Sequence, residues 1–139
     1  MRVTTTTRIA CPPEQVFDTL ADLRNEPRWN SRVSTAELRS TESIGPGSRF
    51  GIVNGGTPYD VTITDYDRPS RLVLEASGNP DLTIAYTVTP TVDGTQLVSD
   101  FDFRPRGALK LLLPLLAPVI RRDVPKQYAS LKALCEHSN

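Results

Sequence analysis

Between residues 32 and 103, short segments of alternating apolar and polar residues are separated by strong turn sequences. In Tyr59–Asp67, the alternation places Tyr59, Val61 and Ile63 on one face of a strand. The stretches "SIGPGSRF" and "NGGTP" are Gly/Pro turns, and the "DG" of "VDGT" is typical of a two-residue hairpin. This spacing predicts an antiparallel meander with strands at Arg32–Arg39, Ser48–Val53, Tyr59–Asp67, Leu72–Ser77, Leu82–Thr89 and Gln96–Phe103.

The residues before this meander predict a strand followed by a helix. Arg2–Ala10 is rich in threonine and other β-branched residues, which favour a strand. Pro12 and Pro13 suit the first turn of a helix, and the apolar residues after them have helical spacing: Val16, Phe17, Leu20 and Leu23. The segment "RNEPRWN" interrupts this pattern at Pro27 and contains the only tryptophan, Trp29.

The residues after the meander predict one long helix. Its apolar stripe advances by three or four residues at a time, as one face of a helix does: Leu116, Ile120, Val124, Tyr128, Leu131 and Cys135. Pro125 lies within this pattern, and proline removes a backbone donor and clashes with the preceding turn. We therefore expect a kink or a break at Pro125.

The order of strand, one or two short helices, six strands and a long helix predicts an α+β fold in a single domain, residues 1–139. A sheet of about seven antiparallel strands is too strongly twisted to stay flat, so it curls. A long helix across the concave face leaves a gap that large side chains fill or that stays hollow. Only 6% of the residues are aromatic, and the strands are rich in Thr, Ser and Ala, which favours a hollow.

The most apolar run of the chain is Leu109–Arg122, "LKLLLPLLAPVIRR". A helix that spans a membrane needs roughly 20 apolar residues. The apolar part, Ala108–Ile120, is shorter and contains Lys110 and two prolines. We therefore expect no transmembrane segment, whereas a helix lying flat on a bilayer surface remains compatible with the run.

Composition and the scarcity of histidine exclude several classes of function. Lys+Arg and Asp+Glu both number 16, so the chain lacks the basic footprint of a nucleic-acid-binding protein. The start "MRVTTTTRIACPP" lacks the apolar core of a signal peptide, so the cytoplasm is the expected location. Cys11 and Cys135 are expected to be packing residues. The only histidine is His137, so we expect neither a Ser-His-Asp triad nor a metal or cofactor site.

Five segments resemble one family in its order along the chain: "RIACPPEQVFDTLADLRNEPRWNSRV", "GPGSRF", "VTITDYDRPSRLVLE", "YTVTPTVDGTQL" and "RPRGALKLLLPLL". The chain resembles the polyketide cyclase/dehydrase and lipid transport (SRPBCC) family of the START/Bet v 1-like superfamily. The resemblance implies a helix-grip fold, in which a curved sheet wraps around the long C-terminal helix with an apolar cavity between them. It also places Ala108–Ile120 at the mouth of that cavity.

We expect the cavity to be lined from the inward faces of the strands and of the long helix, by Trp29, Phe50, Tyr59, Val61, Ile63, Leu74, Tyr86, Phe101, Phe103, Leu112, Leu116, Ile120 and Tyr128. The hydroxyls of Tyr59 and Tyr86 could hold a ligand carbonyl or phenol, or their tips could simply reach water. Trp29 either caps the cavity or plugs the core.

Three residues are weak catalytic candidates, and none is assigned a role: Arg49, Tyr86 and Asp100. An inward Arg49 could polarise an enolate oxygen, and an inward Asp100 could accept a proton from carbon alpha to a carbonyl. If both residues face solvent, an enzyme hypothesis loses its main acid–base groups, because the sequence offers few others.

Three functions fit these observations. The first is binding of a hydrophobic small molecule, lipid-like or polyaromatic, in the internal cavity. The second is an enzyme of the polyketide cyclase or dehydratase type that uses polar groups of the cavity. The third is an interaction protein, a homodimer or a membrane-surface partner, that uses the leucine-rich start of the long helix. We favour the first.

Overall fold

The computed structural model describes residues 1–40 and 43–137. It begins with strand β1 (Arg2–Ile9), which leads into three short helical segments, α1 (Pro13–Ala21), η1 (Leu23–Asn25) and α2 (Glu26–Trp29). The first turn of a helix has no acceptor for backbone N–H groups, so Pro13 begins α1 without losing a hydrogen bond. The predicted first strand and short helices are therefore confirmed.

Six further strands complete one antiparallel sheet: β2 (Val33–Leu38), β3 (Arg49–Asn54), β4 (Thr57–Asp67), β5 (Arg71–Ser77), β6 (Asp81–Thr91) and β7 (Gly94–Arg104). The sheet order is β1-β7-β6-β5-β4-β3-β2, so the first strand closes the sheet beside the last one. The predicted hairpin joins β6 to β7, with Thr91 opposite Gly94. Each predicted strand is present, and its ends differ from the prediction by at most two residues.

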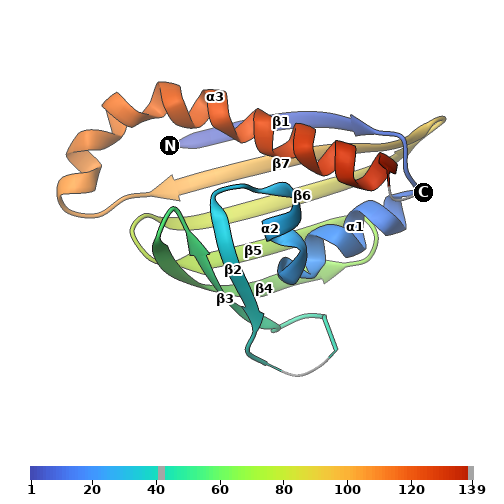
Figure 1. The fold of residues 1–139 in the computed structure, drawn as a ribbon, viewed down its shortest axis with the longest axis horizontal. Coiled ribbons are helices and arrows are strands. Elements are labelled where there is room, and N and C mark those ends of the chain that lie inside the picture. Colours follow the sequence, from blue (N-terminus) through green and yellow to red (C-terminus); the bar gives the residue numbers. More distant parts are fainter. Residues whose placement is uncertain (41–42, 138–139) are drawn as a thin grey trace.

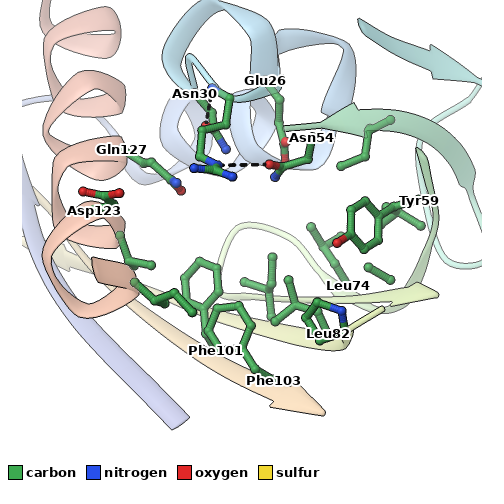
Figure 2. A pocket seen from close by; sticks show the side chains of 18 of the residues that line it. Glu26, Asn30, Asn54, Tyr59, Leu74, Leu82, Phe101, Phe103, Asp123 and Gln127 are labelled. Atoms are coloured by element: carbon green, nitrogen blue, oxygen red, sulfur yellow. Dashed lines mark hydrogen bonds between the residues drawn. The ribbon is translucent and has the colours of Figure 1, made fainter. Parts of the chain in front are cut away.

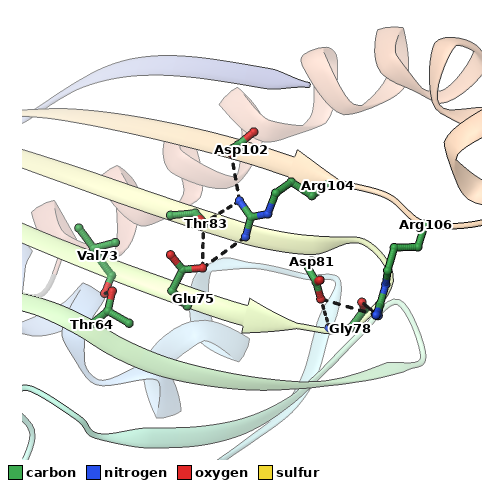
Figure 3. A network of polar contacts seen from close by, with 9 residues as sticks. All are labelled: Thr64, Val73, Glu75, Gly78, Asp81, Thr83, Asp102, Arg104 and Arg106. Carbon is green, nitrogen blue, oxygen red and sulfur yellow. Dashed lines mark hydrogen bonds and ion pairs between the residues drawn. The ribbon is translucent and has the colours of Figure 1, made fainter.

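The sheet curves around the helices, as Figure 1 shows. The register shifts between Val33 and Thr35 in β2, and again between Ile63 and Asp65 in β4. Such irregularities bend a strand and increase its twist. The outer face of the sheet carries charged side chains, among them Arg104, which forms ion pairs with Glu75 and Asp102 (Figure 3). The inner face is therefore the one that builds the core.

Helix α3 (Ala108–His137) runs across the concave side of the sheet (Figure 1). Of the kink or break expected at Pro125, the break does not occur, because the helix continues through Pro114, Pro118 and Pro125. All three prolines are at least partly exposed, so the carbonyls that lose their helical partners can be hydrated. Prolines on the outer side of a helix bend its axis toward the other side, and in Figure 1 the first turns of α3 curve.

The inner face of the sheet is built from rows of side chains that cross several strands. One row contains Ile63, Leu74, Ile84 and Phe101, and the next contains Val61, Ala76, Leu82 and Phe103. The C-terminal half of α3 packs onto this face through the predicted stripe, of which Val124, Tyr128, Leu131 and Cys135 are buried. Cys11 and Cys135 are both buried and form no disulfide. Buried side chains of α1 and of the end of α3 thus belong to the core cluster on the sheet.

Candidate functional site

A cavity of about 320 Å³ lies between the inner face of the sheet, α2 and the first half of α3 (Figure 2). Its floor comes from the two cross-strand rows, and its roof from α3. The lining also includes Asn54 beside the β3–β4 turn and Pro80 in the β5–β6 turn. These turns lie at the same end of the sheet as the start of α3, so the cavity extends toward that end of the molecule (Figure 1).

The floor of the cavity is apolar. Leu74, Ile84 and Phe101 lie side by side in one row, and Ala76, Leu82 and Phe103 in the next. The rings of Phe101 and Phe103 stack with their centroids 5.8 Å apart. From α3, further apolar residues complete the wall: Leu109, Leu113, Leu116, Val119, Ile120 and Val124. A ligand in this space would be surrounded mainly by hydrocarbon.

Polar side chains gather on one side of the cavity, opposite the phenylalanines (Figure 2). They come from α2, the segment after it, the β3–β4 turn and α3: Glu26, Asn30, Arg32, Asn54, Asp123 and Gln127. The Nε of Arg32 donates to the Oδ1 of Asn54 at 3.4 Å, which holds both side chains at the rim. The cavity is therefore amphiphilic, with an apolar floor and a polar flank.

Two tyrosines form a hydrogen-bonded pair at the inner end of the cavity. The hydroxyls of Tyr86 on β6 and Tyr128 on α3 are 2.7 Å apart, and both residues are buried. Burial raises the pKa of Tyr86 and of Tyr128 far above the ordinary value, so both hydroxyls stay neutral. Trp29 and Phe101 pack against Tyr128, with ring centroids 5.4 and 5.9 Å away.

Glu26, the first residue of α2, is a site residue that sequence reasoning missed. Its side chain is 7% exposed and lines the cavity. Burial raises its pKa from 4.5 to about 7, because the low-polarity surroundings disfavour the charged form. The sequence carried no signal for it, because residues three apart share one face only within a helix, and the helical pattern is interrupted at Pro27, between Glu26 and Trp29.

Ten of the thirteen predicted cavity residues line the cavity: Trp29, Tyr59, Val61, Leu74, Tyr86, Phe101, Phe103, Leu116, Ile120 and Tyr128. Trp29 belongs both to the lining and to the buried core, so capping and plugging are not exclusive. Their contact with a ligand stays a prediction.

The other three predicted lining residues lie elsewhere. Phe50 and Ile63 are buried in the core cluster but do not line the cavity. Leu112 is 49% exposed. A helix turns about 100° per residue, so the four steps of four residues from Tyr128 back to Leu112 add up to a drift of about 160°. Leu113, one residue further on, faces the cavity instead.

The weak catalytic candidates Arg49 and Asp100 lie outside the cavity lining. Arg49 is exposed at the start of β3. Asp100 lies between the inward residues Ser99 and Phe101, so it faces the outer side of the sheet, where it accepts a hydrogen bond from the Thr4 hydroxyl at 2.6 Å. Of the three candidates only Tyr86 reaches the cavity, and Tyr128 already occupies its hydroxyl.

The described residues contain no group of three or more His, Cys, Asp and Glu side chains that could hold a metal ion. His137 is exposed at the end of α3. None of the helices in the described part of the chain has the length and apolarity needed to cross a membrane.

A family model described as polyketide cyclase / dehydrase and lipid transport matches residues 1–136. The chain belongs to this family. The resemblance seen in the sequence is thereby confirmed. None of the curated proteins compared with the chain matches it in sequence.

Solved structures with the same fold share little sequence identity with this chain. A START superfamily protein from Mycobacterium smegmatis has a TM-score of 0.83 at 12% identity, over 99% of both chains. A protein from Thermus thermophilus has a TM-score of 0.77 at 18% identity, over 96% of this chain and 95% of that one. The protein Ara h 8.0201 has a TM-score of 0.73 at 14% identity, over 100% and 99%. These likenesses establish the helix-grip fold.

Proposed function

We propose that this chain binds a hydrophobic small molecule, lipid-like or polyaromatic, in the cavity between the sheet and α3. The observation that carries the proposal is the cavity itself, about 320 Å³ lined mainly by apolar side chains, with polar groups on one flank. Small-molecule sites typically have this composition, in which apolar walls supply affinity and a few polar atoms fix orientation. Family membership is compatible with such a role.

The polyketide cyclase or dehydratase alternative has less support in the site. It relied on Arg49 or Asp100 reaching the cavity near Tyr86, and both lie outside the lining. The groups that remain, Glu26 and the Tyr86–Tyr128 pair, suit recognition of a ligand as well as they suit proton transfer. We therefore place binding first.

The test is a titration with dodecane and with methyl decyl ketone, followed by the fluorescence of Trp29, the only tryptophan. Ala76 lines the floor of the cavity, so Ala76→Leu adds bulk to the binding space. Ala85 lies on the outer side of the neighbouring strand, between the inward residues Ile84 and Tyr86, so Ala85→Leu is the matched control. We expect saturable binding by the wild type and by Ala85→Leu, and binding at least tenfold weaker for Ala76→Leu. Equal binding by all three proteins would place the ligand elsewhere.

The start of α3 favours a second function, reversible contact with an anionic lipid surface. Five of the six exposed large apolar residues among the described residues lie there: Leu111, Leu112, Leu115, Leu116 and Val119. Residues 104–122 contain five basic side chains and no acidic one. Within the described residues, the side chains of Lys110 and Arg121 form no ion pair or hydrogen bond, and they flank the leucines. Basic groups beside an apolar face suit anionic lipid.

Vesicle sedimentation tests this second function. The double variant Leu111→Ser, Leu115→Ser should lose most binding to vesicles of phosphatidylglycerol and phosphatidylcholine. Val92→Ser removes an equally exposed apolar side chain from the distant β6–β7 turn and should bind as the wild type does. Unchanged sedimentation of the double variant contradicts a lipid contact. A dimer that the double variant converts to a monomer, without any vesicle binding, assigns the leucines to a homodimer instead.

A further inference from the structure

The carboxyl of Glu26 is buried beside the cavity without a partner. Its side chain is 7% exposed, and within residues 1–40 and 43–137 no hydrogen bond or ion pair engages its oxygens. Figure 2 shows Glu26 reaching from α2 toward the open space, on the polar flank and across from Phe101 and Phe103. The carboxyl oxygens retain accessible surface, and Glu26 lines the cavity, so a molecule in the cavity can form a hydrogen bond with them.

The groups around Glu26 leave its carboxyl unpaired. Tyr86 on β6 and Tyr128 on α3 satisfy each other and stay neutral. Arg24 forms an ion pair with Asp22, whereas Arg28 and Arg32 donate to the neutral amides of Asn25 and Asn54 and keep their charges. Neither of them forms an ion pair with Glu26, and burial alone raises the pKa of Glu26. The other cavity-lining acid, Asp123, and the phenol of Tyr59 add no positive charge. Among the described residues, no cation therefore forms an ion pair with an ionised Glu26.

We propose that Glu26 recognises the polar end of the bound molecule, as a neutral carboxylic acid that donates a hydrogen bond to a carbonyl oxygen. This inference rests on the proposed function, and it narrows the ligand class to apolar molecules that carry a ketone or ester carbonyl. The apolar body would lie on the row of Phe101 and Phe103, and the carbonyl would face α2.

The protonation state of Glu26 supports this assignment. Burial raises its pKa to about 7, and a carbonyl that accepts its proton stabilises the neutral form further. A neutral acid avoids the cost of burying a charge. An alkylammonium ligand would require the opposite state, an ionised carboxylate, and would therefore bind more tightly as the pH rises.

The experiment compares three probes of matched length, methyl decyl ketone, dodecane and dodecylamine, on the wild type and on Glu26→Gln between about pH 5 and about pH 9. Trp29 fluorescence reports binding. For the wild type, the ketone should bind about tenfold more weakly at the higher pH, which is the worth of one buried hydrogen bond. In Glu26→Gln the amide donates at every pH, so ketone binding should be retained and should lose its pH dependence. Dodecane should bind independently of pH in both proteins.

A spectroscopic readout on the wild type makes the test independent of the variant. The infrared carbonyl stretch of the bound ketone should lie at lower frequency at the lower pH, because a hydrogen bond weakens the C=O bond, and should return toward its value in hydrocarbon at the higher pH. A stretch that does not move with pH overturns the inference even if Glu26→Gln fails to fold.

The outcomes separate this inference from the proposed function. If the ketone and dodecane bind the wild type equally at all pH values, the cavity binds apolar molecules but Glu26 does not recognise a carbonyl. If dodecylamine binds best and tightens as the pH rises, Glu26 acts as a carboxylate, and the inference is wrong. If no probe binds at any pH, the proposed function fails together with it.

Discussion

At the scale of single residues, the Tyr86–Tyr128 pair is the clearest case of two groups that depend on each other. Each hydroxyl is buried, and each is the partner of the other at 2.7 Å. Because a buried hydroxyl without a partner is costly, losing the second hydroxyl should cost less than losing the first.

We therefore predict that Tyr86→Phe and Tyr128→Phe each lower the free energy of unfolding by about 1–3 kcal/mol. The double variant should lose less than the sum of the two, because neither ring then carries an unpaired hydroxyl. Urea denaturation of the four proteins measures the coupling. Strictly additive losses would show that the two hydroxyls do not stabilise each other.

The buried carboxyl of Glu26 predicts a pH dependence of stability. Its pKa is about 7 in the folded chain, against an ordinary value of 4.5 when unfolded, so between these values the folded state binds more protons. Stability from this group is therefore fully present below about pH 4.5 and is lost as the pH rises through 7. The difference between the folded and unfolded pKa values of Glu26 corresponds to about 3 kcal/mol of unfolding free energy.

Urea denaturation of Glu26→Gln checks this prediction, because glutamine is neutral at every pH. Relative to the wild type, the variant should gain about 3 kcal/mol of unfolding free energy between about pH 4 and about pH 9. A difference that stays constant over this range would mean that Glu26 titrates as an exposed carboxyl does.

The sequence could not show Glu26 as a site residue for a physical reason. A glutamate before a proline in "RNEPRWN" has the pattern of an exposed helix start. Its burial arises because α2 contacts both β2 and α3, which is a tertiary effect without a local signature. By contrast, alternation alone placed Tyr86, Phe101 and Phe103 on the inner face correctly.

At the scale of elements, a small polar clamp joins the segment before α3 to the β5–β6 turn. The Arg106 guanidinium donates to the carbonyl of Gly78 and lies 3.7 Å from Asp81 (Figure 3). The backbone N–H of Arg106 donates to the side-chain oxygen of Asn79 at 3.0 Å. Because Pro80 in this turn lines the cavity, the clamp holds part of the cavity rim against the start of α3.

Arg106→Ala should loosen the first turns of α3 without unfolding the protein. The side-chain contacts are exposed, so we expect a loss of about 1 kcal/mol and amide hydrogen exchange about fivefold faster around Leu109 and Leu113. Arg121→Ala removes an exposed arginine without such contacts and serves as the control. Equal exchange in the two variants would show that the clamp does not hold the helix start.

The sequence periodicity predicted which side chains face inward more accurately in the strands than in α3. Strand faces follow from a period of two, which does not drift along a short strand, so the face that the alternation predicted for β4, with Tyr59, Val61 and Ile63, is the inward one. In α3 the apolar spacing of four drifts by about 40° per step, and the bend of its first turns adds to this. Prediction therefore succeeded near Tyr128 and failed at Leu112.

At the scale of the whole molecule, the fold divides into a solid half and a hollow half. Near the end of α3, the buried side chains of α1 and of the sheet fill the core, whereas under the first half of α3 the sheet residues meet about 320 Å³ of space. The sequence predicted the helix-grip through its order of elements and its family resemblance. The position of the hollow depended on where the short helices pack, which no periodicity encodes.

The central claim is that the hollow half binds an apolar molecule. The most direct measurement is a nuclear magnetic resonance titration of the wild type with methyl decyl ketone, with every backbone and methyl signal followed to saturation. The account predicts that the largest shifts fall on the lining residues of β5, β6, β7 and the inner side of α3, among them Leu74, Ile84 and Leu113. Shifts confined to the outer leucines Leu111 and Leu115, or no shifts at saturation, would contradict it.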